Sequence, residues 1–195
     1  MTRPGEMMRP AAAQLMGTRW VVLSHPHPQF GGTMNNKVVT TLEKAFQSLG
    51  FGTLAYNYRG VGLSEGDYDG GEGESLDLAS VVTWLREQVS VEELILAGFS
   101  FGSYVTLKQA DSLSANGVCT VAPPVSMYDL SELYPNAPWV LIQGSDDEVV
   151  DPQAVLTWAL KAPSNPDIFW RSGASHFFHR QLIWLRKVIT LAYAD

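Results

Sequence analysis

Cysteine is almost absent from this chain of 195 residues. The single cysteine, Cys119, excludes an intrachain disulfide, which is consistent with a reducing compartment and a cytoplasmic location. Cys119 lies in the apolar run 117–121. We therefore expect it to be a buried core side chain rather than a reactive thiol.

Long apolar runs and excess positive charge are also lacking. No apolar run approaches the roughly 20 residues that cross a bilayer, and none follows the arginines near the N-terminus, so we expect neither a membrane span nor a signal peptide. The 13 lysine and arginine residues are outnumbered by 20 aspartate and glutamate residues, and the formal net charge is −7. Because a negative surface repels phosphate backbones, nucleic acid is not an expected partner.

What is present is a strong alternation of short apolar runs with longer segments of helical periodicity. We expect strands at 20–24, 51–58, 94–97, 118–122, 139–143 and 168–170, and helices at 35–49, 76–89, 101–110, 152–160 and 178–194, with a loop over 59–75. The alternation predicts an α/β fold with a doubly wound, mainly parallel sheet and helices on both faces. The length suits one domain over residues 1–195. Ligands of such sheets bind at the carboxyl ends of the strands.

The pattern Gly-x-Ser-x-Gly occurs twice, at 98–102 and at 62–66. A serine nucleophile needs a tight turn between a strand and a helix, where small flanking residues relieve crowding and the helix N-terminus favours negative charge. Ser100 follows an apolar strand and precedes a helical run, whereas Ser64 is followed by a glycine- and aspartate-rich loop. We expect Ser100 to be the nucleophile, and the alternative for it is a buried turn serine without chemistry.

A serine hydroxyl needs a base, and the base needs a carboxylate that orients it. Only His176 and His179 follow Ser100, and His176 comes between the sixth strand and the last helix. We expect His176 to be the base and His179 to be a polar residue at the start of the helix. The acid candidates follow the fifth strand; we expect Asp147, with Asp146 and Asp151 as alternatives and Glu148 as a solvated charge.

Acyl transfer also needs backbone donors for the oxyanion. The first expected donor is the amide of Phe101, which follows the nucleophile. The second should come from the loop 25–32, where Pro26 and Pro28 have no N–H. That leaves the amides of His27, Gln29 or Phe30, and we favour His27.

His25 and His27 form a His-x-His pair, which could bind a metal ion. A catalytic zinc ion needs a third ligand and outer hydrogen-bond partners, and nothing nearby in the sequence supplies them. We therefore expect no metal and no cofactor, and we interpret both histidines as residues that shape the loop.

Five segments, taken in order, are similar to a known family: 25–37, 59–66, 98–102, 143–152 and 175–179. Together they resemble the small, lidless bacterial α/β-hydrolases, mostly of unknown substrate, which are related to the dienelactone-hydrolase group. The resemblance implies a Ser100–Asp147–His176 triad and a structural turn at 59–66, which explains Ser64 without catalysis. One departure is that relatives begin with a strand hairpin, whereas here only residues 1–19 precede the strand at Trp20. We expect one strand at 6–9 and a shortened sheet edge.

We expect a hydrolase that cleaves an acyl bond, an ester or thioester of a small molecule, as a monomer or homodimer. The segment 123–138 is too short for a cap domain, which predicts an open site. An apolar wall is expected from aromatic residues that could equally be core: Phe99, Phe101, Tyr128, Phe177 and Phe178. The rival functions are a peptidase or C–C hydrolase with the same triad, and a non-catalytic binding protein on this fold.

Overall fold

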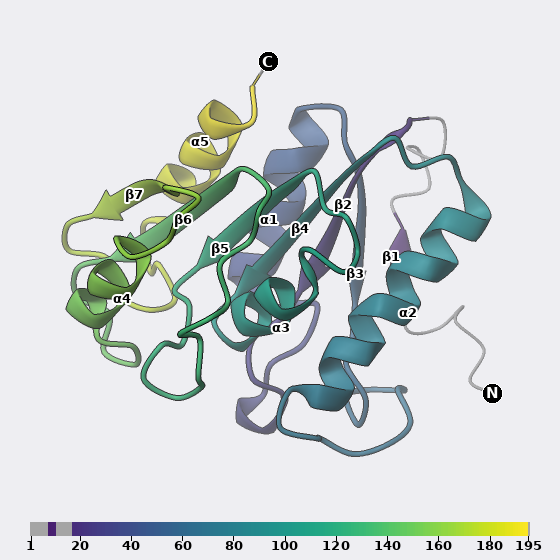
Figure 1. Cartoon of the computed structure of the whole chain (residues 1–195), viewed down its shortest axis with the longest axis horizontal. Coiled ribbons are helices and arrows are strands. Elements are labelled where there is room, and N and C mark those ends of the chain that lie inside the picture. Colours follow the sequence, from purple (N-terminus) through teal and green to yellow (C-terminus); the bar gives the residue numbers. More distant parts are fainter. Residues whose placement is uncertain (1–7, 11–16, 195) are drawn as a thin grey trace.

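The computed structural model describes residues 8–10 and 17–194, and its framework is a seven-stranded sheet (Figure 1). The strands are β1 (Met8–Pro10), β2 (Arg19–Ser24), β3 (Gly52–Tyr56), β4 (Glu93–Phe99), β5 (Gly117–Val121), β6 (Trp139–Gly144) and β7 (Asp167–Arg171). The helices are α1 (Lys37–Ser48), α2 (Glu72–Gln88), α3 (Phe101–Gln109), α4 (Pro152–Ala159) and α5 (Leu182–Ala192), with a short 3₁₀ turn at Pro28–Phe30.

The sheet has the order β1-β3-β2-β4-β5-β6-β7, and all neighbours are parallel except β1 and β3. Helices α1 and α5 pack on one face through one apolar cluster, and α2, α3 and α4 pack on the other face (Figure 1). The predicted α/β fold, with a mainly parallel sheet between two helical layers, is therefore confirmed.

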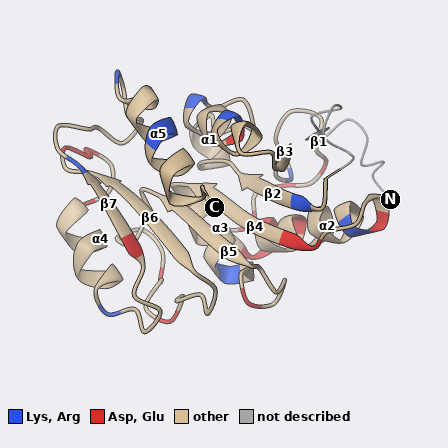
Figure 2. Ribbon diagram, turned by 90° about the horizontal axis from the view of Figure 1, so that it is seen from above, with Lys and Arg blue, Asp and Glu red and all other residues tan. Residues whose placement is uncertain are grey.

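The central strands are buried on both faces, which explains their continuous apolar runs. Among β2, β4, β5 and β6, charged residues occur only at the amino ends of β2 and β4, as Figure 2 also shows. Those two end residues, Arg19 and Glu93, are neighbours in register and form an ion pair. Cys119 is fully buried within β5. Burial raises the pKa of this thiol to about 12, so it is an inert core residue, as predicted.

The direction of winding reverses between β2 and β4. From β2 the chain crosses to β3 on one side, then returns to β4 on the other side and continues outward to β7. Parallel α/β sheets have a crevice at such a point, outside the carboxyl ends of the strands. The segments that follow β2 and β4 are the loop 25–32 and the turn at Ser100, so the topology brings them together.

Three helices begin at other residues than predicted. Helix α1 begins at Lys37 rather than 35, because Asn36 is its N-cap and accepts the Val38 amide through Oδ1. Helix α2 begins at Glu72 rather than 76, because Gly71 has a left-handed backbone (φ 101°) and the buried Glu74 carboxylate accepts the amides of Asp69 and Gly71. Helix α5 begins at Leu182 rather than 178. Phe178 (φ 52°) and Arg180 (φ 61°) have left-handed backbones that no α-helix accommodates, although their sequence has helical periodicity.

The expected strand at 6–9 falls partly outside the described residues. Residues 8–10 form β1, an edge strand antiparallel to β3. The sheet edge on this side is thus a three-residue strand. Residues 11–16, which follow β1, lie outside the described residues, and so does the expected departure in this segment.

The segment 122–138 contains turns but neither a helix nor a strand. No cap domain therefore covers the carboxyl ends of the strands from this segment, as the sequence predicted. Within residues 8–10 and 17–194 no helix is long and apolar enough to cross a membrane.

Candidate functional site

Ser100 lies in a sharp turn between β4 and α3. Its backbone is strained (φ 54°, ψ −121°), and its amide donates to the Val121 carbonyl oxygen of the neighbouring strand at 2.8 Å. A Cβ atom on Gly98 would lie 2.2 Å from the Gly102 carbonyl oxygen. A Cβ atom on Gly102 would lie 2.2 Å from the Ser24 carbonyl oxygen at the end of β2. Both glycines are thus required by close backbone approach, which is the physical basis of the Gly-x-Ser-x-Gly pattern.

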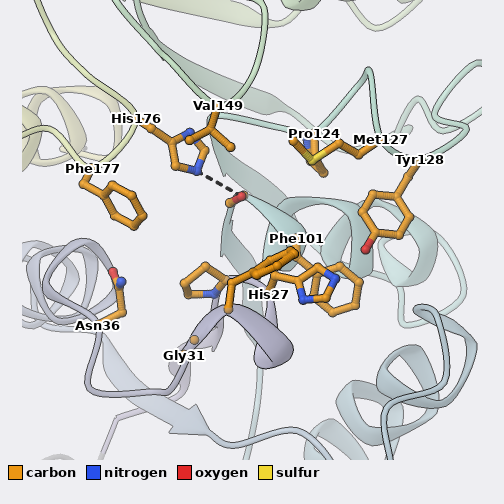
Figure 3. A pocket seen from close by; sticks show the side chains of 14 residues that line it. His27, Gly31, Asn36, Phe101, Pro124, Met127, Tyr128, Val149, His176 and Phe177 are labelled. Carbon is orange, nitrogen blue, oxygen red and sulfur yellow. Dashed lines mark hydrogen bonds between the residues drawn. The ribbon is translucent and has the colours of Figure 1, made fainter.

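The structure brings Ser100, His176 and Asp147 together from three separate loops. The Oγ atom of Ser100 lies 3.1 Å from Nε2 of His176, as the dashed line in Figure 3 marks. The Nδ1 atom of the same ring lies 2.8 Å from Oδ2 of Asp147. Since an ionised carboxylate can only accept, Nδ1 carries the proton and Nε2 is free to accept the Ser100 hydroxyl proton.

Asp147 is buried and accepts hydrogen bonds on both oxygens. Oδ1 accepts the amides of Val149 and Val150 at 2.9 and 2.8 Å, and Oδ2 accepts the Gln143 side chain as well as His176. Burial by itself would raise the pKa of Asp147, but the hydrogen bond from His176 and those from the two amides outweigh it and lower the pKa below its usual value. The carboxylate therefore stays ionised.

Gln143 is a site residue that the sequence reasoning missed. It is the next-to-last residue of β6 and is fully buried. Its Nε2 donates to Asp147 Oδ2 at 3.0 Å and to the Gly144 carbonyl oxygen at 3.1 Å. The available signal was a polar residue at the end of a wholly apolar strand. A buried amide of this kind needs partners, and the residues that follow the strand supply them.

The other acid candidates lie elsewhere. Asp146 is exposed and accepts the Ser145 hydroxyl, and Asp151 is the N-cap of α4, where it accepts the Gln153 amide. Glu148 accepts the backbone amide of His176 at 3.1 Å, so it supports the loop of the histidine rather than its ring. Of the four acids after β6, only Asp147 contacts the imidazole of His176 among the described contacts.

The two competing residues, Ser64 and His179, are outside this arrangement. Ser64 lies in the 59–66 turn, and its hydroxyl donates to the Asn57 carbonyl oxygen, just before the turn, at 3.1 Å. His179 is exposed and precedes α5 instead of lying in its first turn. The position of Ser64 agrees with the expected structural turn. His179 lies before α5 and not at its start as expected, because the left-handed backbone of Arg180 delays the helix.

Two backbone amides of residues that line the cleft have no acceptor in the part of the chain that the structure describes. One is that of Phe101, the first residue of α3, whose N–H has no partner within the helix. The other is that of His27. The amide of Gln29 donates to the His27 ring and that of Phe30 to the His27 carbonyl oxygen. This difference favours His27 among the three candidates for the second donor.

His25 is buried, and both of its ring nitrogens are used. Nδ1 contacts the Pro26 carbonyl oxygen at 2.7 Å, and Nε2 accepts the Tyr58 amide at 3.2 Å. Burial lowers the pKa of His25 to about 4, so the ring is neutral and links the loop to the end of β3. The described residues contain no group of three or more metal-binding side chains. Because both ring nitrogens of His25 already have partners, neither is left for a metal ion.

A cleft of about 350 Å³ opens above Ser100 (Figure 3). Its walls come from the loop 25–32, the N-cap of α1, the turn at Ser100, the segment 122–138 and the loop of His176. Three of the expected aromatic residues line it: Phe101, Tyr128 and Phe177. Phe99 and Phe178 do not, because both are fully buried in the core between the sheet and the α1–α5 layer.

The geometry agrees with comparisons to known proteins. Residues 27–112 match the family described as the alpha/beta hydrolase fold. An uncharacterized protein of Rickettsia prowazekii is 33% identical over 176 residues, which cover 85% of this chain and 74% of that protein.

Two solved structures are also similar. An α/β serine hydrolase without a lid from Xanthomonas campestris is 42% identical, with a TM-score of 0.87 over 89% of this chain and 80% of the other. An α/β serine hydrolase homologue from Coxiella burnetii is 40% identical, with a TM-score of 0.91 over 100% of this chain and 95% of the other. With the sheet topology and the turn at Ser100, these similarities show that the chain belongs to the α/β-hydrolase family.

Proposed function

We propose that this protein is a serine hydrolase that cleaves a carboxylic ester or thioester of a small molecule through an acyl-enzyme. The observation that carries the proposal is the chain of hydrogen bonds from Ser100 Oγ through His176 to Asp147, with distances of 3.1 and 2.8 Å. Ser100, at the start of this chain of hydrogen bonds, lines the cleft and lies on a strained turn at the N-terminus of α3.

In the first half-reaction Ser100 Oγ attacks the substrate carbonyl carbon, and His176 Nε2 takes the hydroxyl proton. The new Oγ–C bond pushes the carbonyl π electrons onto oxygen, where the amides of Phe101 and His27 donate to the oxyanion. Asp147 orients the ring and stabilises the imidazolium that forms.

The tetrahedral intermediate collapses when the carbonyl re-forms and the bond to the leaving oxygen or sulfur breaks. His176 gives its proton to that atom, and the alcohol or thiol departs. Water then repeats the sequence on the acyl-enzyme, with His176 as the base, and releases the acid and the Ser100 hydroxyl. Every step uses groups of this chain and water, so the proposal requires no cofactor or metal ion.

The cleft supports a small substrate. Its volume of about 350 Å³ is near the lower end of the range for small-molecule sites, and most of its lining is apolar or aromatic. A short ester or thioester fits such a cleft. A peptidase would need hydrogen-bond donors and acceptors that hold the extended backbone of a peptide substrate. The apolar lining of this cleft offers few of them.

The test is labelling with a fluorophosphonate probe, which forms a covalent bond with an activated serine. The wild type should be labelled, and Ser100→Ala, verified as folded by circular dichroism, should not. Hydrolysis of p-nitrophenyl acetate, of an acetyl thioester and of a peptide p-nitroanilide then separates the substrate classes. A folded wild type that remains unlabelled and hydrolyses none of the three would refute the proposal, whereas hydrolysis of the anilide alone would favour the peptidase.

A further inference from the structure

We propose that the cleft receives the two halves of the ester on opposite sides of Ser100, and that Asn36 recognises the leaving group. The acyl group would lie against Met127 and Tyr128, and the leaving group beside Phe177, where Asn36 Nδ2 donates to an oxygen of the alcohol. The inference rests on the proposed function, because it assigns substrate halves to the reaction of Ser100. It predicts esters of a short apolar acid with an alcohol that carries a second oxygen.

The assignment of sides follows from the direction of proton transfer. The leaving oxygen must lie within hydrogen-bond reach of His176 Nε2, which returns the proton. The oxyanion must face the amide of Phe101. The acyl substituent therefore occupies the remaining direction, away from His176. Figure 3 shows Phe177 and Asn36 on the His176 side of the cleft, and Met127 and Tyr128 on the other side.

Asn36 offers a free donor on the leaving-group side. Its Oδ1 accepts the Val38 amide at 2.8 Å and thereby caps α1, which fixes the orientation of the side chain. Its Nδ2 has no acceptor in the described part of the chain, and the residue lines the cleft. An amide N–H₂ group held in this way can donate to an ether, hydroxyl or carbonyl oxygen.

On the opposite side, the Tyr128 hydroxyl is already paired. It contacts the Tyr68 hydroxyl at 2.9 Å, and the Tyr128 ring stacks on Tyr104 with centroids 4.6 Å apart. These contacts make Tyr128 a rigid wall. Met127, with 53% of its surface exposed, supplies an apolar and adaptable edge beside it. This side suits an apolar acyl group whose length is limited by the wall.

The experiment uses two variants and one control in the full chain. Asn36→Asp keeps the capping oxygen and the shape of the side chain but removes the Nδ2 donor. Met127→Ala widens the acyl side at an exposed position. Asn35→Asp places the same new charge one residue away, at a position that does not line the cleft, and controls for electrostatics.

Each variant is measured on two pairs of substrates. 2-Methoxyethyl acetate and n-butyl acetate differ by one ether oxygen in the leaving group, and p-nitrophenyl acetate and hexanoate differ only in the acyl chain. The ratio of kcat/KM within a pair cancels general losses of activity. Asn36→Asp should lower the methoxyethyl preference by about three- to tenfold, the effect of one hydrogen bond, and leave the acyl ratio unchanged. Met127→Ala should raise the hexanoate-to-acetate ratio and leave the leaving-group ratio unchanged.

Three results would overturn the inference. The first is an unchanged methoxyethyl preference in Asn36→Asp, and the second is an equal loss in Asn35→Asp. The third is a crossed result, in which Met127→Ala changes the leaving-group ratio and Asn36→Asp the acyl ratio. A wild type that hydrolyses none of the four esters is a different outcome, since it refutes the proposed ester hydrolysis itself.

Discussion

The substitution Gln143→Met tests whether Gln143 positions Asp147 for catalysis or only fills space in the core. Methionine keeps the unbranched shape but removes the Nε2 donor that lies 3.0 Å from Asp147 Oδ2. A hydrogen bond to an ionised group contributes about 1.5–3 kcal/mol, so the loss of orientation of Asp147 should lower kcat by roughly 10- to 100-fold. Gln143 does not line the cleft, and KM should therefore change little.

The free energy of unfolding should change by less than the sum of the two lost hydrogen bonds. The substitution also removes the buried Oε1 of Gln143, which has no hydrogen-bond partner in the described part of the chain. An unpaired buried acceptor costs about 1–3 kcal/mol, and its removal offsets much of the loss of the two Nε2 hydrogen bonds. The net change should stay within about 2 kcal/mol of zero, which a urea-unfolding curve measures.

The matched control is Gln47→Met. Gln47 Nε2 donates to Thr53 Oγ1 at 2.9 Å, and neither residue lines the cleft. This variant should lose one side-chain hydrogen bond, between neutral groups, without any loss of kcat. The reasoning fails if Gln143→Met hydrolyses p-nitrophenyl acetate with a kcat within twofold of the wild type, or if Gln47→Met loses as much activity as Gln143→Met.

Three further predictions concern the supporting structure. Because burial lowers the pKa of His25 from 6.5 to about 4, the unfolded state binds a proton more readily than the native state, and about 3 kcal/mol of stability should be lost as the pH falls from 6.5 to 4. Urea unfolding should show a lower free energy of unfolding at pH 4.5 than at pH 7, and this difference should be smaller in His25→Gln. An equal difference in both proteins would contradict the lowered pKa of His25. Gly102→Ala should destabilise the fold by more than about 2 kcal/mol, since its Cβ would meet the Ser24 carbonyl oxygen at 2.2 Å, and a melting temperature equal to that of the wild type would exclude this close approach. Ser64→Ala should retain probe labelling and esterase activity within twofold, because its hydroxyl only supports a turn; loss of labelling in a folded Ser64→Ala would revive it as the nucleophile.

The fold and the order of the site residues could be predicted from local patterns. Strands buried on both faces must be continuous apolar runs, and helices must repeat at 3.6 residues, so the parallel sheet was visible from the alternation alone. The strand-to-helix context separated Ser100 from Ser64, because only one of the two patterns stands where a helix N-terminus can follow a strand.

Tertiary structure decided what depends on contacts between distant segments. The choice of Asp147 among four neighbouring acids depends on which carboxylate meets a ring 29 residues away, and loop geometry sets this rather than composition. The starts of α2 and α5 depend on left-handed backbones at Gly71, Phe178 and Arg180, which helical periodicity does not reveal. Phe99 and Phe178 belong to the core rather than to the cleft, because the side of the sheet that an aromatic residue faces is determined by packing.

The site residues also divide into those that the sequence determined and those that only the packed structure placed. The sequence by itself determined a serine, a histidine and an acid at the carboxyl edge of a parallel sheet, because strand direction places all three at one edge. Only the folded chain decided how Gln143 holds the acid and how Asn36 and Tyr128 face each other across the cleft. Both arrangements bring together residues that no local pattern connects, and they form only when the elements pack.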